Sequence, residues 1–343
     1  MEQLWLVFVV CVLVTAFPSG AFQLNKQKLH RPLASLSSSL VGSDEKIDKA
    51  VETNSSEKNE KTAVLLCPAQ FCVPADYEVL MSLLKKENPS ISTCKVTPLP
   101  RTEWIKVAKQ LPTKPFLDAS LSCYKTLDWY FDAMEQALSQ IFAEEGNDVK
   151  ICIVGHSIGG WVARAYLGGL SGSSTAVYRL AQKQISSFIT LGTPHSSPDS
   201  ALVDQTRGLL KEVERSSSCS SQALADRGID LTCVGSSGLS GKIFTSDLEE
   251  IVAATSYFPL IGSIGENVRG DGIIPEDLAF MEEPARRITI EKCYETGSPV
   301  RHAHVLPTPW NLWDGEAPSI PLPDDFVWYG SNSVVGEWSK FIC

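Results

Sequence analysis

The chain contains 343 residues, of which 43% are hydrophobic, and its formal net charge at pH 7 is −10. A chain of this length buries a large core, as one large domain or as two. The acidic balance argues against a surface that binds nucleic acid, because phosphate backbones attract Lys and Arg. No basic patch interleaved with aromatic residues occurs either, so we expect no nucleic-acid partner.

The chain begins with an apolar run of 14 residues at 4–17. A membrane-spanning helix needs about 20 residues, and the small residues at 18–21 suit cleavage after a signal peptide. The start lacks Lys and Arg and carries Glu2, which is unusual for a signal peptide. We nevertheless predict that residues 1–21 are a signal peptide, with a membrane anchor as the alternative.

Residues 22–61 have a different composition, with a Ser-rich stretch, mixed charges and no hydrophobic period, which is typical of disorder. The junction Ser19-Gly-Ala-Phe22 resembles the Ala-Phe junction of bipartite presequences in algae with complex plastids. Residues 22–40 contain no acidic residue, as transit peptides prefer. This pattern predicts plastid targeting. The alternative is a protein of the ER lumen or a secreted protein, with a loose linker over 22–61.

The folded domain is predicted to cover 62–343. Residues 63–66 form a short apolar run typical of a strand, and the turn Cys67-Pro-Ala-Gln70 follows it. A helix is expected over 77–86, a second strand over 93–99, and a long amphipathic helix within 121–145.

A second apolar run, residues 151–154, leads into Gly155-His-Ser-Ile-Gly159, and helical spacing of apolar residues follows. Strand, G-x-S-x-G turn and helix together indicate a nucleophile elbow with Ser157 as the nucleophile. A serine in a strained turn crowds the residues two before and two after it, so both positions favour glycine. The helix directs its N-terminal dipole at the serine, where an oxyanion would develop.

A strand is predicted over 185–191. Residues 197–256 are irregular and Ser-rich, with a short strand at 231–234 and a helix from 246 to about 254. An insertion above the sheet is where a cap or lid would lie, so we predict one over 197–256.

Asp271 lies in an Asp-Gly turn after this segment, where a hydrolase places its acid, although a plain loop is the alternative. A last strand is predicted over 287–290, and His302 and His304 follow it. Ser157, Asp271 and His302 thus occur in the chain order of α/β-hydrolase triads. An imidazole takes the proton of the serine hydroxyl, and the acid fixes the tautomer of the imidazole.

Only five histidines occur in the chain. His30 lies in the N-terminal segment, the side chain of His156 should diverge from that of the adjacent serine, and His195 follows the strand directly after the elbow. The base is therefore His302 or His304. We favour His302, because the pattern His-x-x-Val-Leu looks like the catalytic base of a hydrolase family, followed by residues that face the core.

The tetrahedral intermediate needs an oxyanion hole. One donor would be the backbone N–H of Ile158, directly after the nucleophile, and the second comes from a loop after an early strand. Gln70 occupies that place, so its backbone N–H is the expected second donor. Ala69 stands where glycine is usual, and a simple strand-to-helix turn is the alternative.

The cysteines show no metal-binding pattern. Cys67 and Cys72 are five positions apart, and no second pair follows at the spacing of a zinc site, so no metal is expected. Cys152 lies inside the apolar run before the elbow and is expected to be a small buried hydrophobe. Four others are disulfide candidates whose pairing the sequence leaves open: Cys219, Cys233, Cys293 and Cys343.

Three blocks resemble α/β-hydrolase lipases and esterases of the GPI inositol-deacylase-like branch: Gly155-His-Ser-Ile-Gly-Gly-Trp161, Thr190-Leu-Gly-Thr-Pro-His195 and Gly270-Asp-Gly-Ile-Ile-Pro275. The blocks Cys67-Pro-Ala-Gln-Phe71 and Asp204-Gln-Thr-Arg-Gly-Leu-Leu210 are similar to a plant and algal group of that branch, with many plastid-directed members. The resemblance implies an α/β-hydrolase fold, with a mostly parallel central sheet, helices on both faces and a cap insertion.

The resemblance further implies hydrolysis of carboxylic esters, often lipid esters, without a metal or cofactor. We therefore predict a serine carboxylic-ester hydrolase that acts through an acyl-enzyme on a lipid or other acyl ester, with peripheral contact to a membrane surface left open. The alternatives are an acyltransferase with the same acyl-enzyme and a non-catalytic binding protein that retains the fold. The specific ester and the oligomeric state are not determined by the sequence.

Overall fold

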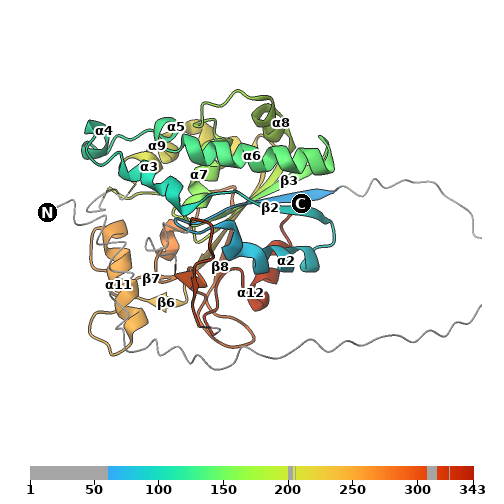
Figure 1. Ribbon diagram of the computed structural model, residues 1–343. Coiled ribbons are helices and arrows are strands. Elements are labelled where there is room, and N and C mark those ends of the chain that lie inside the picture. The colour runs from blue at the N-terminus through green and yellow to red at the C-terminus, as the bar shows by residue number, and fades with distance from the viewer. Residues whose placement is uncertain (1–60, 200–203, 205, 307–314, 324) are drawn as a thin grey trace, which may run out of the picture. The chain divides into compact units, whose positions relative to one another are not determined.

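The computed structural model describes residues 61–199, 204, 206–306, 315–323 and 325–343. The predicted signal peptide over 1–21, and all of the 22–61 segment except Lys61, lie outside the described residues. At the centre is a sheet of six strands in which every pair of neighbours is parallel (Figure 1). In spatial order the strands are β2 (Ile91–Val96), β1 (Thr62–Cys67), β3 (Lys150–His156), β4 (Ile185–Leu191), β5 (Asp230–Ser236) and β8 (Arg286–Ile290).

The central strands are apolar along their length because helices cover both faces of the sheet. All six residues of β1 are buried. Side chains alternate between the faces of a strand, so Ala63 and Leu65 pack in one core layer, while Val64 and Leu66 pack in the other. The covering on both faces confirms the predicted α/β architecture.

The first core layer is the larger, and it holds most of the buried aromatic rings among the described residues. The second layer, on the opposite face, is formed by two helices from the two ends of the domain sequence (Figure 1). Within the described ranges, no helix has both the length and the apolar character needed to cross a membrane. The helices of the first layer are α3 (Ile105–Ala108), α4 (Lys114–Leu117), α5 (Cys123–Thr126), α6 (Asp128–Glu145), α7 (Ile158–Leu167), α8 (Ala176–Gln184), α9 (Leu209–Arg215) and α10 (Ser221–Ala225), and those of the second are α2 (Glu78–Glu87) and α12 (Asn332–Ser339).

Two small antiparallel pairs lie outside the main sheet. β6 (Leu239–Ser240) pairs with β7 (Arg269–Gly270), and β9 (Val305–Leu306) pairs with β10 (Ile320–Pro321). The helix α11 (Leu248–Ile261) connects β6 to β7. Its Tyr257 hydroxyl accepts a hydrogen bond from the N–H of Gly272 (2.9 Å) and lies 3.3 Å from the carbonyl of Leu239. These bonds hold α11 against the loop that follows β7.

The second strand is displaced from its prediction. β2 begins at Ile91 and ends at Val96, whereas the sequence predicts a strand over 93–99. Pro98 and Pro100 explain the earlier end, because proline has no N–H to donate to a neighbouring strand. The last link to β1 is made just after the strand, from the N–H of Thr97 to the carbonyl of Leu66 (2.8 Å).

The predicted cap insertion over 197–256 is wrong as a single insertion. β5 pairs with β4 on one side and with β8 on the other, so this segment supplies a strand of the main sheet. The strand is short, but Leu231, Cys233 and Val234 are buried between the helical layers. Leu209 and Leu210 of α9 also belong to the first core layer. In the sequence a Ser-rich stretch separates these two apolar groups, so they could not be recognised as parts of one core.

The disulfide prediction is also wrong for the described part of the chain, where all nine cysteines are free thiols. Cys293 lies 3.0 Å from the Ser333 hydroxyl, Cys233 lies beside the His195 ring, and Cys343 is exposed at the C-terminus. Cys152 is fully buried, as predicted for a small hydrophobe.

Candidate active site

Ser157 lies in the sharp turn between β3 and α7. Its φ of 55° and ψ of −126° are a backbone conformation that residues other than glycine rarely adopt. Its N–H donates to the carbonyl of Leu191 at the end of β4 (2.9 Å), which ties the turn to the next strand. The turn therefore presents the serine hydroxyl at the carboxyl edge of the sheet, as in a nucleophile elbow.

Three glycines permit this turn because each lies against another backbone or side chain. A Cβ on Gly155 would lie 2.3 Å from the Cα of Gly160, and a Cβ on Gly160 would lie 2.0 Å from the hydroxyl of Thr193. A Cβ on Gly159 would lie 2.2 Å from the carbonyl oxygen of Cys67. The glycines two before and two after Ser157 are thus required by close approach, as the sequence predicts.

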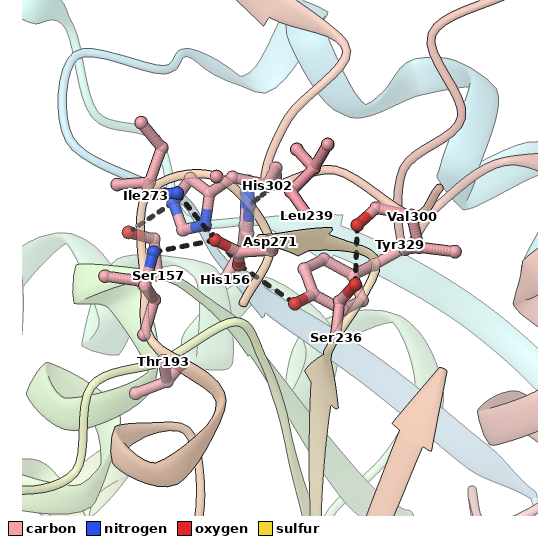
Figure 2. A network of polar contacts seen from close by, with 12 residues as sticks. His156, Ser157, Thr193, Ser236, Leu239, Asp271, Ile273, Val300, His302 and Tyr329 are labelled. Carbon is pink, nitrogen blue, oxygen red and sulfur yellow. Dashed lines mark hydrogen bonds and ion pairs between the residues drawn. The ribbon is translucent and has the colours of Figure 1, made fainter. Parts of the chain in front are cut away.

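The structure brings together Ser157, His302 and Asp271, although 145 positions separate the first two (Figure 2). The Nε2 atom of His302 lies 3.0 Å from the Oγ of Ser157, and its Nδ1 lies 2.8 Å from the Oδ2 of Asp271. These distances are ordinary hydrogen-bond lengths. The three side chains therefore form a connected hydroxyl–imidazole–carboxylate series.

Asp271 is a carboxylate with its solvent exposure reduced to 2%. Its Oδ1 accepts from the N–H groups of Ile273 (3.0 Å) and Ile274 (2.7 Å), and its Oδ2 accepts from the Tyr329 hydroxyl (2.9 Å) as well as from His302. Burial by itself would raise the pKa of Asp271, but the His302 imidazole and the two N–H donors hold that pKa below its ordinary value. An ionised Asp271 accepts the Nδ1 proton of His302 and leaves Nε2 free to accept the serine proton.

His304, the alternate base, lies away from Ser157. Its Nε2 donates to the backbone carbonyl of Asp76 (2.9 Å), and its ring stacks on Trp328 with the centroids 4.1 Å apart. Burial lowers the pKa of His304, which favours the neutral ring in this position. Of the two candidates that the sequence left open, the structure thus brings only His302 to the nucleophile.

The other two histidines of the described ranges also turn away from Ser157. His195 is buried and shares a hydrogen bond with the Thr190 hydroxyl (3.0 Å). His156 directs its ring toward the Tyr77 hydroxyl and the carbonyl of His302, so its side chain diverges from that of Ser157, as predicted.

Two tyrosine contacts that the sequence did not predict hold Asp271 and the neighbouring residue His156. Tyr329 donates to Asp271 from a loop 58 positions away, and Tyr77 contacts the ring of His156 across 79 positions. Both tyrosines are buried in the second core layer. Both contacts join segments far apart in the chain, so no pattern of neighbouring residues indicated them.

The two expected oxyanion donors belong to segments that pack against each other. A Cβ added to Gly159 would lie 2.2 Å from the Cys67 carbonyl oxygen, so the turn after β1 packs against the first turn of α7. The N–H groups of Gln70 and Ile158 donate to no other group within the described part of the chain. Gln70 is exposed and Ile158 is half-buried.

No group of three or more His, Cys, Asp or Glu side chains among the described residues is arranged to hold a metal ion. The side chains at the carboxyl edge of the sheet instead combine a hydroxyl, an imidazole and a buried carboxylate. Such a set can activate an oxygen nucleophile by transfer of its proton to the imidazole.

Comparison with protein families agrees with this architecture. A family model described as a PGAP1-like alpha/beta domain matches residues 124–259, which include α6, the elbow and β4 and β5. The chain has the α/β-hydrolase fold. Comparison with the curated proteins finds no match for this chain.

Solved structures similar to the chain include esterases and a thioesterase. An acetyl xylan esterase, solved as an iodinated complex, is 16% identical, with a TM-score of 0.28 over 41% of this chain and 67% of that chain. The catalytic core domain of acetyl xylan esterase from Trichoderma reesei is 15% identical, with a TM-score of 0.26 over 40% of this chain and 65% of that chain. RedJ, a thioesterase from the prodiginine biosynthetic pathway in Streptomyces coelicolor, is 13% identical, with a TM-score of 0.26 over 60% and 79%.

Proposed function

We propose that this protein is a serine hydrolase that cleaves carboxylic esters through an acyl-enzyme on Ser157. The observation that carries the proposal is the hydrogen-bonded series from the strained Ser157 through His302 to the buried Asp271, with distances of 3.0 and 2.8 Å. A serine hydroxyl by itself is a weak nucleophile, and an adjacent base oriented by an acid is the arrangement that activates it.

The reaction would proceed in two halves. The Oγ of Ser157 attacks the carbonyl carbon of the ester while Nε2 of His302 takes the hydroxyl proton. The imidazolium then gives this proton to the departing alkoxide, which leaves as an alcohol, and the acyl group remains on Ser157. Water attacks the acyl-enzyme with His302 again as base, and the carboxylic acid leaves as the proton returns to Ser157.

The negative charge of each tetrahedral intermediate would be stabilised by the N–H groups of Gln70 and Ile158. Neither N–H has an acceptor within the described residues, and the two segments that carry them pack against each other. Both observations support this assignment. Ile158 is also the first residue of α7, so the helix dipole adds a positive potential at the same place.

A lipid or other acyl ester is the substrate class that we propose. Exposed apolar side chains in α11 and the segments that flank it support this substrate class, because α11 contacts the loop that carries Asp271 through the Tyr257 hydroxyl. Phe244 is 93% exposed, and Leu248 and Ile264 are about half exposed. α11 carries no charged residue after Glu250. Such a surface suits a long apolar acyl chain or a lipid aggregate.

The test is covalent labelling of the full-length protein with a fluorophosphonate probe, beside Ser157→Ala. Labelling of the parent alone is the expected result, since the probe reacts with an activated serine. Labelling of neither protein, with and without lipid vesicles, would contradict the proposal and favour a binding protein that retains the fold. Product analysis with an added acceptor alcohol distinguishes hydrolysis from acyl transfer, because only a transferase converts most of the acyl-enzyme to a new ester.

A further inference from the structure

A series of three hydrogen bonds connects the turn that carries Gln70 to the loop that carries His302. The N–H of Ala69 donates to the Tyr77 hydroxyl (2.9 Å). That hydroxyl lies 2.8 Å from Nδ1 of His156, and Nε2 of His156 lies 2.8 Å from the backbone carbonyl of His302. The series therefore begins at the backbone of the Gln70 turn and ends at the backbone of His302.

The direction of each bond is determined by its two ends. A carbonyl oxygen only accepts, so His156 must carry its proton on Nε2 in order to donate to His302. A neutral imidazole with a proton on Nε2 has an acceptor at Nδ1, to which the Tyr77 hydroxyl donates. The lone pairs of that hydroxyl then accept the N–H of Ala69. Every polar atom of the Tyr77 and His156 side chains therefore takes part in a hydrogen bond, and the donor and acceptor roles are compatible along the whole series.

His156 and Tyr77 are both 1% exposed, so water cannot replace these bonds. The titratable side chains around His156 are Tyr77, His302, His304 and Asp271. Burial, followed by the proximity of His302, lowers the pKa of His156 to about 3. The neutral tautomer that the series requires is thus present throughout the neutral pH range.

At one end, the series holds the backbone N–H of Ala69, the residue before the expected oxyanion donor Gln70. The carbonyl of Ala69 accepts from the N–H of Cys72 (3.1 Å), while its N–H donates to Tyr77. In a trans peptide the carbonyl of Ala69 and the N–H of Gln70 point in opposite directions. A fixed carbonyl therefore also fixes the direction of the Gln70 N–H. Phe71 supplies the positive φ (61°) that this tight turn needs.

At the other end, the series holds the backbone of the base. The N–H of His302 donates to the backbone carbonyl of Asp271 (2.9 Å), and its carbonyl accepts from His156. The backbone of His302 is thus held from two sides, independently of the bond between its side chain and the Asp271 carboxylate.

We propose that His156 and Tyr77 are positioning residues that hold the Gln70 N–H and the His302 imidazole at a constant separation across Ser157. The inference rests on the proposed function. His156 cannot act as a second base, because both of its ring nitrogens are engaged and Nε2 faces a carbonyl. His195 provides the contrast: it is equally buried, but its ring bonds to Thr190 and reaches neither loop.

The test uses full-length variants and p-nitrophenyl butyrate as the ester. Tyr77→Phe removes one hydroxyl and keeps the ring. Its matched control is Tyr166→Phe, because the Tyr166 hydroxyl is buried without a hydrogen-bond partner in the described structure. His156→Leu removes both bonds of the imidazole, whereas His156→Gln retains an amide N–H for the His302 carbonyl. His195→Gln is the control for the loss of a buried histidine.

We expect Tyr77→Phe to lower kcat about 10-fold and His156→Leu about 100-fold, with KM within about two-fold of the parent. Mispositioned catalytic groups reduce the stabilisation of the transition state and leave substrate binding largely unchanged. His156→Gln should recover at least about five-fold of the loss in His156→Leu, because it restores one bond. The rate of fluorophosphonate labelling should fall in parallel, and both controls should keep kcat within about two-fold.

Equal kcat in Tyr77→Phe, His156→Gln and the two controls, with only the melting temperature lowered, would overturn the positioning role. If His156→Leu does not fold, the other two variants decide the question, since each retains a side chain of similar volume. If the parent itself neither reacts with the probe nor hydrolyses the ester, the proposed function fails and the inference fails with it. If the parent is active and only the variants lose activity, the result tests the hydrogen-bond series and not the proposed function.

Discussion

Asp271 is ionised although it is almost completely buried, because the protein surrounds it with donors. The lowered pKa means that ionised Asp271 contributes stability above the ordinary carboxyl pKa. This contribution is lost as the pH falls through the lowered value. The same donors determine that the Nδ1 of His302 carries a proton.

Asp271→Asn should lower kcat by about 10³- to 10⁴-fold with little change in the fold, because an amide no longer selects the reactive tautomer of His302. Steady-state kinetics on the full-length variant measure the effect. Tyr329→Phe, which removes one donor to the same oxygen, should give a far smaller loss. A kcat of Asp271→Asn above a tenth of the parent value would contradict the role of the carboxylate.

Buried neutral histidines make the stability depend on pH. The pKa of His156 is lowered to about 3, first by burial, whereas an unfolded histidine titrates near 6.5. Between these values the unfolded chain binds a proton that the folded chain does not. Stability therefore rises with pH across this interval, by up to about 1.4 kcal/mol per pH unit for each such group. Burial also lowers the pKa of His195, which acts in the same direction.

We expect the free energy of unfolding of the parent to fall steeply between pH 6.5 and pH 4. In His156→Gln it should be lower at pH 7 but fall less steeply with acid, because one proton-linked group is gone. Urea unfolding at several pH values measures both slopes, and His195→Gln should show a similar flattening. Parallel curves for the parent and both variants would show that these rings are protonated in the folded state.

At the scale of single elements, packing requires the glycine at position 159 of α7 but not the glycine at position 336 of α12. Gly159 lies against the Cys67 and Pro68 carbonyl oxygens, at 2.2 and 2.6 Å from an added Cβ, and these are backbone atoms that cannot rotate away. Gly336 lies on the exposed side of α12, and an added Cβ there meets no atom within 4 Å. Gly336 is therefore present without a packing requirement.

Gly159→Ala should lower the free energy of unfolding by about 3 kcal/mol, as overpacking of a tight contact does, and should slow fluorophosphonate labelling by displacing the Gln70 turn. Gly336→Ala should raise it by about 1 kcal/mol, because alanine is the better helix former. Denaturant unfolding of the two variants measures the contrast. A neutral Gly159→Ala would mean that the turn after β1 does not lie against α7.

Another element-scale link joins α11 to the loop of the base. The guanidinium of Arg301 donates from Nε and Nη2 to the two carboxylate oxygens of Glu249, both at 2.9 Å. Arg301 is the residue before His302, and Glu249 lies in the first turn of α11. Bidentate pairs fix orientation as well as distance, so the position of α11 and the position of the base are connected.

At the scale of the whole molecule, the N-terminal 61 residues carry the targeting prediction, while residues 62–343 carry the proposed active site. We propose plastid targeting on the basis of the apolar run, the Ala21-Phe22 junction and the lack of acidic residues over 22–40. A fluorescent fusion of residues 1–61 in an alga with a complex plastid should accumulate in that plastid. The same fusion without residues 1–21 should remain in the cytosol. A reticular ER or secreted signal from the longer fusion would contradict plastid targeting.

Local sequence was sufficient for the elbow and for the strand that follows it. The apolar run of β3, the glycines around Ser157 and the helical spacing after them predicted the elbow, because strand, turn and helix torsions are set by neighbours. The same reasoning predicted β4 at its observed bounds. The chain order of Ser157, Asp271 and His302 also followed from the sequence, since it needs no knowledge of distance.

The tertiary structure decided everything that depends on contacts between distant segments. β5 could be recognised as a sheet strand only when β4 and β8 were seen on either side of it. The choice between His302 and His304 depended on which ring reaches Ser157. The two histidines are only two residues apart in one loop, so the sequence does not show which ring does so. The bonds from Tyr77 to His156 and from Tyr329 to Asp271 cross 79 and 58 positions. Such bonds arise from the packing of helices on a sheet, which local patterns do not encode.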